Sequence, residues 1–133
     1  MYVTRKGDYA IRCVLFLSRE AGRIISANEI SQWASVPKSF LAKILQSLSR
    51  AGIVKSTQGI AGGFRLAKPP DEVSLLDVIK AVQGLSALNM CAIDRHKCSL
   101  SSTCVIHPIW VQIMEDLEER LRKETFAKLI GKS

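Results

Sequence analysis

Pro37 limits how this chain can fold more than any other residue does. Proline is tolerated at the start of a helix but not in its interior, so the amphipathic segments on either side of Pro37 must be separate helices. The stretch Ser26-Ala27-Asn28-Glu29 has the pattern of a capping box, which predicts that the first of these helices begins after Ser26. Pro37 then opens the second helix, which ends at Gly52. Its apolar residues recur at helical spacing and form one stripe: Phe40, Leu41, Ile44, Leu45 and Leu48. Two helices joined by so tight a turn predict a helix-turn-helix.

A basic hairpin is predicted directly after this pair of helices. Residues 53–57 and 64–67 alternate between apolar and polar side chains, and the glycine-rich segment 58–63 separates them. Helix, helix and hairpin is the order of a winged helix-turn-helix, in which the second helix enters the major groove of DNA. The glycines do not indicate a nucleotide-binding loop, because neither Gly-Lys-Ser/Thr nor a helix follows them.

Positive charge is concentrated in the first half of the chain. Residues 1–70 contain eleven Lys and Arg but three Asp and Glu, a net charge of +8, whereas residues 71–133 have a net charge of −1. A basic half joined to a neutral half indicates contact with phosphate groups. The longest apolar run, residues 10–17, includes Arg12 and is far shorter than the roughly 20 residues of a membrane helix. With no signal peptide visible either, we expect a cytoplasmic protein with no membrane partner.

Three further helices frame the predicted reading unit. The first begins after Thr4, a candidate N-cap, and ends before Gly22, with apolar residues nearly all round. The next opens with Ser74-Leu75-Leu76-Asp77, another capping-box pattern. A long C-terminal helix opens at Pro108 and carries an apolar stripe opposite a strongly charged face. A DNA-reading unit this small usually needs a second copy to cover two half-sites, so we expect this helix to form a homodimer.

The cysteines point to a metal or redox site. Three of the four lie in one stretch without helical periodicity, at Cys91, Cys98 and Cys104, and His107 follows the third with two residues between them. Such clustering in a cytosolic chain indicates metal ligands or redox-active thiols rather than structural disulfides. Residue types alone leave iron–sulfur, zinc and thiol-only chemistry open, with His107 as a candidate fourth ligand. Cys13 falls within the apolar first helix, where we expect it to be part of the core.

Taken together, several motifs resemble those of one family. They are Thr4, Lys6-Gly7-Asp8-Tyr9-Ala10, the turn Gly59-Ile60-Ala61-Gly62-Gly63-Phe64, and Cys91, Cys98, Cys104 and His107. The chain resembles, over nearly its whole length, the small bacterial winged-helix repressors that include IscR, NsrR and CymR. The resemblance implies a homodimer on double-stranded operator DNA, and a 2Fe–2S or 4Fe–4S cluster on the three cysteines. It also implies a fourth ligand, which is a histidine in IscR-like members, matched by His107, or an aspartate of the partner subunit in NsrR-like members, matched by Asp8. Of these two we favour Asp8, together with a 4Fe–4S cluster.

From these observations we predict a mainly α-helical protein with a small β wing. Its expected parts are a winged helix-turn-helix (1–88), a cysteine-rich cluster-binding loop (89–107), and a dimerisation helix with a docking turn (108–133). Six side chains are expected to meet DNA: Lys38, Ser39, Lys43, Lys55, Gln58 and Arg65. The cations among them suit phosphate, while Ser39 and Gln58 suit base edges.

The predicted function is transcription regulation, with repression gated by an iron–sulfur cluster that responds to iron, redox state or nitric oxide. A thiol-based or zinc-stabilised winged-helix regulator is the alternative. A thiol enzyme is disfavoured, because only His96 and His107 could serve as its base.

Overall fold

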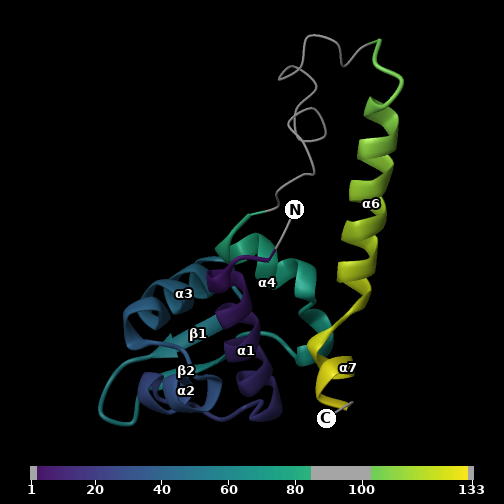
Figure 1. The fold of residues 1–133 in the computed structure, drawn as a ribbon. Helices are drawn as coiled ribbons and strands as arrows, with labels where there is room; N and C mark the ends of the chain where they lie inside the picture. Colours follow the sequence, from purple (N-terminus) through teal and green to yellow (C-terminus); the bar gives the residue numbers. More distant parts are fainter. Residues whose placement is uncertain (1–2, 85–102, 132–133) are drawn as a thin grey trace.

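The computed structural model describes residues 3–84 and 103–131 and is mainly helical with one small sheet. Its elements, in chain order, are α1 (Arg5–Arg19), α2 (Ala27–Ala34), α3 (Lys38–Arg50), β1 (Val54–Thr57), β2 (Gly63–Leu66), the short 3-10 helix η1 (Pro70–Glu72), α4 (Leu75–Val82), α6 (His107–Lys123) and α7 (Phe126–Gly131). Figure 1 shows a body made of α1 to α4 and the hairpin, with α6 standing beside it. The mainly helical winged fold is therefore confirmed. No helix in the described ranges is long and apolar enough to cross a membrane.

The helix ends lie where local sequence signals predicted them. The Thr4 hydroxyl accepts a hydrogen bond from the Gly7 N–H at the start of α1, and Ser74 and Asp77 form a complete capping box on α4. Pro37 is the N-cap residue of α3, and Gly52, with φ of 78°, follows its last turn. The capping box at α2 is only half formed: Ser26 accepts from the Glu29 N–H, but the Glu29 carboxylate binds Arg23.

The core is built around α1. One side of this helix packs on α2 and α3, and the other on α4 and α7. Val14 and Leu17 of α1, Ile30 of α2, and Ile44 and Leu48 of α3 are all buried in the same cluster. Cys13 is fully buried there as well, as predicted. These buried stripes determine which face of α3 is turned to solvent.

The hairpin is hydrogen-bonded to the start of the helix-turn-helix. Strands β1 and β2 are antiparallel, with Val54 opposite Leu66 and Lys55 opposite Arg65. Phe64 and Ile25 exchange two backbone hydrogen bonds of 2.8 Å, just before α2 begins. A side chain at Gly63 would meet the Ile25 carbonyl oxygen, so this close approach requires glycine.

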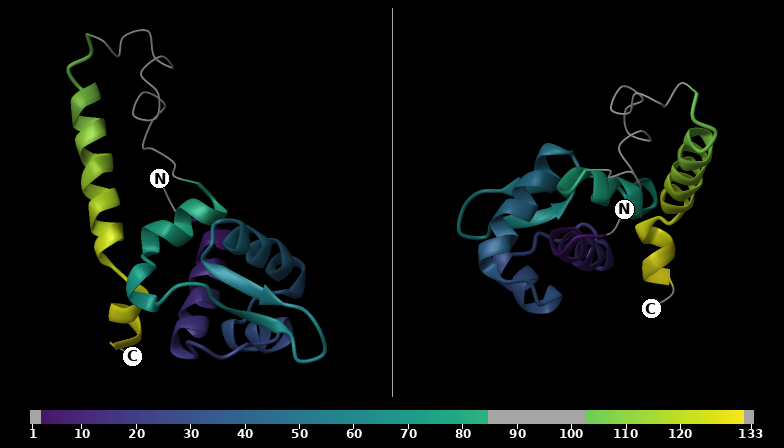
Figure 2. Two further views of the ribbon diagram at one scale, coloured as in Figure 1. Left: turned by 180° about the vertical axis from the view of Figure 1, so that it is seen from behind. Right: turned by 45° about the horizontal axis from the view of Figure 1, so that its top comes forward.

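Helix α6 begins away from the body and runs toward it, and α7 then packs against the body (Figures 1 and 2). In both views of Figure 2, α6 extends well beyond α4, while α7 lies against the body. Ser74 and Thr125 form a β-bridge, and the N–H of Phe126 donates to the Val73 carbonyl at 2.9 Å. The Phe126 side chain is completely buried in the core cluster around α1. The C-terminal end of α6 is therefore joined to the body through α7.

Candidate nucleic-acid interface and cysteine segment

Helix α3 presents a polar and basic face to solvent. Its buried residues, Leu41, Ile44, Leu45 and Leu48, occupy the inner side, so the remaining positions face outward. Lys38, Ser39 and Lys43 are all exposed, as the predicted role in DNA binding requires. The same face continues along the helix through Gln46 and Arg50, which are also exposed.

The hairpin places two cations opposite each other. Lys55 and Arg65 are register partners across the antiparallel pair, which sets their side chains on the same face of the sheet. Lys55 is exposed and Arg65 half-buried, while Gln58 is exposed in the turn between the strands. Like charges directly opposite one another destabilise a sheet unless an anion compensates them. The hairpin is therefore electrostatically suited to an anionic partner.

The cations of α3 and the hairpin lack carboxylate partners. Residues 30–70 contain six Lys and Arg and no Asp or Glu. Within residues 3–84 and 103–131, none of these six cations forms an ion pair, whereas Arg122 and Lys123 on α6 pair with Glu118 and Glu119. The positive charge on this side of the molecule is left for an external anion to neutralise.

A hollow of about 340 Å³ separates α3 from the hairpin. Its lining residues come from both elements: Ala42, Leu45, Gln46, Ser49, Ser56, Gln58 and Phe64. Gln46, Ser49 and Ser56 were not predicted as site residues. Their hydroxyl and amide groups are suited to base-edge or phosphate contacts.

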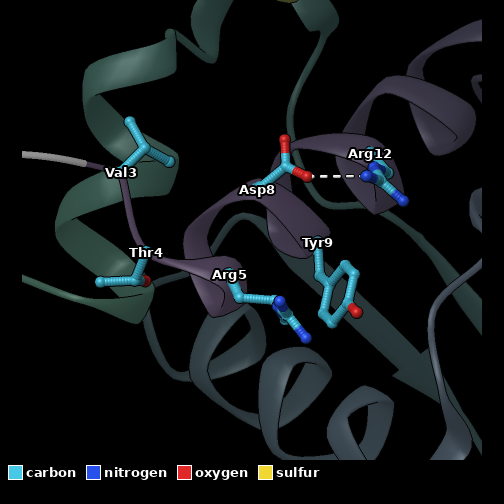
Figure 3. A pocket seen from close by; sticks show the side chains of 6 residues that line it. All are labelled: Val3, Thr4, Arg5, Asp8, Tyr9 and Arg12. Atoms are coloured by element: carbon cyan, nitrogen blue, oxygen red, sulfur yellow. Dashed lines mark ion pairs between the residues drawn. The ribbon is translucent and has the colours of Figure 1, made fainter.

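Asp8 lies in a second open hollow, of about 560 Å³, at the N-terminal end of α1 (Figure 3). An Asp8 carboxylate oxygen (Oδ2) is 2.8 Å from Nη2 of Arg12, and both side chains are about half exposed. Arg12 also donates to the carbonyl oxygen of Ala34, at the end of α2, and its guanidinium lies 5.4 Å from the centre of the Tyr9 ring. Tyr9 in turn meets Phe40 of α3 edge to face, at 5.6 Å between ring centres. Asp8 is thus connected to both helices of the helix-turn-helix.

The cysteine segment is described only at its end. Cys91 and Cys98 lie outside the described residues, while Cys104 is half-buried and is not in a disulfide. His107, the first residue of α6, is 8% exposed, and its Nδ1 is buried without a hydrogen-bond partner among the described residues. A buried ring nitrogen without a partner is what a ligand position would leave when nothing is bound to it.

The predicted ligands do not gather at one point in the described part of the chain. The residues at 3–84 and 103–131 contain no group of three or more His, Cys, Asp or Glu that could hold a metal ion. Cys104 and His107 lie where α6 begins, at the end of that helix away from the body, whereas Asp8 is in the first turn of α1, within the body (Figures 1 and 2).

Cys13 is buried, whereas Cys104 is half-buried. Burial raises the pKa of the Cys13 thiol to about 12, and the positive charge of Arg12 opposes this only in part. A buried thiol whose ionisation is this strongly opposed is a poor nucleophile, which agrees with a role in the core.

The N-cap and first turns of α6 carry an apolar surface that the described residues leave about half exposed. Ile106, Ile109 and Ile113 are 47%, 54% and 40% exposed and follow one another at three- and four-residue spacing. Met114, on the neighbouring side of the helix, is buried. Ile113 and Met114 belong to the predicted apolar stripe, which is thus part exposed and part buried, whereas Ile106 and Ile109 were not predicted as part of it.

Comparison with known proteins identifies the family. Residues 3–132 match the family model Rrf2, described as iron-dependent transcriptional regulator. A protein of Aquifex aeolicus (strain VF5), whose name places it with HTH-type transcriptional regulators, is 32% identical over 92% of this chain and 87% of that protein. Another of the same description, from Haemophilus influenzae, is 31% identical over 99% and 88%.

Solved structures share the fold. The structure titled T. potens IscR has a TM-score of 0.78 at 23% identity, covering 99% of this chain and 88% of that one. The structure of CymR, titled as the global cysteine regulator of B. subtilis, has a TM-score of 0.80 at 23% identity, with coverages of 100% and 98%.

Proposed function

Because this chain belongs to the Rrf2 family of transcriptional regulators, we propose that it is a homodimeric repressor that binds operator DNA under the control of an iron–sulfur cluster. Members of this family are regulators and not enzymes. The observation that carries the DNA-binding part is the set of unpaired cations on α3 and the hairpin, in a stretch of forty-one residues without a carboxylate.

The face around α3 supports a division of roles on DNA. Lys38 and Lys43 are exposed cations that suit phosphates on either side of the major groove, and Ser39 beside them suits a base edge. Lys55 and Arg65 on the hairpin suit the backbone next to it, with Gln58 reaching a base. Gln46, Ser49 and Ser56, which line the hollow between these elements, extend the reading surface.

Homodimer formation is supported by the exposed apolar stripe of α6. Ile106, Ile109 and Ile113 would bury their side chains against the same stripe of a second copy, as in a two-fold symmetric contact. Two copies would also supply the two reading heads that a palindromic operator requires.

The residues present fit an iron–sulfur cluster. Cys91, Cys98 and Cys104 offer three thiolates, and the unpartnered Nδ1 of His107 offers a fourth donor three residues after the last of them. Asp8 of the partner subunit is the other candidate for the fourth position, and we favour it, with a 4Fe–4S cluster. When bound, such a cluster supplies sensitivity to iron supply, oxidants and nitric oxide.

Control of DNA binding is supported by the contacts of Asp8 within its own chain. Arg12 joins Asp8 to the end of α2, and Tyr9 joins Arg12 to Phe40 at the start of α3. A change in what Asp8 binds would alter these contacts and, through them, the position of α3 relative to α1. A coupling of about 1–3 kcal/mol would change operator affinity by about 5–150-fold.

The test begins with protein isolated without oxygen, whose visible spectrum, iron and sulfide content are measured. We expect a coloured protein with iron and sulfide in equal amounts. Operator duplexes are then selected from a random DNA library, and affinities are compared for the parent, a variant with Ser at Cys91, Cys98 and Cys104, and the control Cys13→Ala. The triple variant should be colourless and bind its operator at least fivefold differently, whereas Cys13→Ala should keep the colour. Equal affinity of parent and triple variant would refute cluster control.

A thiol-based regulator is the second candidate. It is favoured by the half-buried, unpaired Cys104 thiol and by the likeness in fold to CymR. Iron-free, colourless protein whose operator affinity changes on mild oxidation and returns with a reductant would support it. Stoichiometric zinc in colourless protein would instead indicate a zinc-stabilised regulator.

A further inference from the structure

The tip of the hairpin carries an isoleucine that nothing in the described structure covers. Ile60 is 110% exposed relative to the reference for its residue type, the highest value among the large hydrophobic side chains of residues 3–84 and 103–131. An apolar side chain so fully in water gains nothing for the fold of this chain. Its whole side chain is therefore available for contact with another molecule.

The backbone of the tip holds Ile60 outward on a narrow turn. The N–H of Gly62 donates to the Gly59 carbonyl at 3.0 Å, which makes Ile60 and Ala61 the central residues of a β-turn. Gly59 has φ of 107°, and a Cβ at Gly62 would lie 2.9 Å from the Gly59 carbonyl oxygen. With only glycine and alanine beside it in this turn, Ile60 is the sole large side chain at the point of the wing.

The surroundings of this tip are polar or basic, not apolar. Lys55 and Arg65 lie on the strands behind it, and Gln58 directly precedes the turn. A protein-binding patch would need apolar neighbours, and within the described residues the hairpin offers Ile60 none at its tip. The two cations lie two residue pairs behind the turn, and a single apolar group projects beyond them. Cations that suit phosphates with an apolar tip ahead of them fit the minor groove, whose floor and walls are base edges and deoxyribose carbons.

We propose that Ile60 enters the minor groove beside the operator half-site and selects A·T over G·C pairs there. This inference rests on the proposed function. The minor groove is only about 6 Å wide, which suits a one-residue tip, and guanine alone places an amino group on its floor. The isoleucine side chain cannot accept a hydrogen bond from that N2 amino group, so burying the group against Ile60 would leave it unsatisfied. At A·T pairs no such donor is present.

The test changes the minor groove without changing the major groove. Operator duplexes selected with the parent protein are remade with 2,6-diaminopurine in place of adenine in the segments flanking each half-site. This base adds the minor-groove amino group of guanine and keeps the major-groove pattern of adenine. Parent protein should bind such a duplex about tenfold more weakly for each wing segment changed. Inosine in place of any guanine in the same segments should strengthen binding.

Variants assign the effect to Ile60. Ile60→Gly should bind the diaminopurine and adenine duplexes with nearly equal affinity, and Ile60→Val should keep most of the parent's discrimination. Ala61→Ser is the control in the same turn and should behave as the parent does. Because the Ile60 side chain is fully exposed, Ile60→Val should melt at the temperature of the parent, and Ile60→Gly within a few degrees of it, since glycine adds freedom to the unfolded chain.

The outcomes separate this inference from the proposed function. If the parent protein selects duplexes yet diaminopurine has no effect, or affects Ile60→Gly as strongly as the parent, the role of Ile60 is refuted and DNA binding stands. If the parent selects no duplex at all, the proposed function fails and the inference fails with it.

Discussion

Replacing Lys43 with alanine should weaken operator binding through the loss of a phosphate contact. Lys43 is exposed on the outer face of α3, and no carboxylate of the described residues pairs with it. Its charge is therefore not already compensated within the protein. A homodimer presents the residue twice, so one substitution removes two cations from the interface.

The size of the effect follows from counterion release. Each phosphate contact contributes about −0.9 to the slope of log K against log salt, so Lys43→Ala should flatten this slope by about 1.8. If parent and variant bind equally at 1 M salt, this difference corresponds to about 30-fold weaker binding near 0.15 M.

The assay is fluorescence anisotropy on a selected operator duplex, repeated from low to high salt. Lys128→Ala is the matched control, because Lys128 is an exposed cation on α7, on the opposite side of the body from α3 (Figures 1 and 2). It removes the same charge and, within the protein, only the hydrogen bond of 2.8 Å from Lys128 Nζ to the Lys123 carbonyl oxygen. No proposed phosphate contact is lost, so its slope should match that of the parent. A slope for Lys43→Ala equal to that of Lys128→Ala would refute the contact and leave only an effect of net charge.

Three further predictions concern the fold. The unfolded chain ionises Cys13 near its ordinary pKa of 9.0, whereas the folded chain keeps it protonated to about 12, so stability should be full below pH 9 and fall between these values. Urea unfolding should show a loss of about 1.4 kcal/mol per pH unit in that window, absent in Cys13→Ala. Gly63→Ala should cost about 1–3 kcal/mol in the same assay, because its Cβ meets the Ile25 carbonyl, whereas Ala61→Gly should cost little. Phe126→Ala should cost about 3–5 kcal/mol, and clearly more than Leu129→Ala, because Phe126 is completely buried and Leu129 is not. Equal costs at these two positions would contradict the docking of α7 through Phe126.

The features that could be predicted from the sequence are those with a local cause. Thr4, Ser74 and Pro37 each determine a helix start through their own side chain and the next few residues, and the structure has helices at all three. The outward position of Lys38 and Lys43 follows equally from the spacing of the buried leucines and isoleucine on α3.

The features that were missed depend on contacts between distant segments. Periodicity assigns Trp33 and Phe40 to apolar faces, yet they are 43% and 41% exposed, because each covers another aromatic side chain at the edge of the core. Glu29 leaves its capping role for Arg23, a competition that no motif encodes. Ser49 and Ser56 become part of the reading surface only once α3 and the hairpin are placed beside each other.

The pair of hydrogen bonds between Ile25 and Phe64 has a consequence for control. They fasten the base of the wing to the residues that lead into α2, and the turn at Pro37 fastens α2 to α3. We therefore expect the hairpin and α3 to move together as one unit. In the proposed homodimer, a signal would therefore change the distance and angle between the two units rather than the shape of either one.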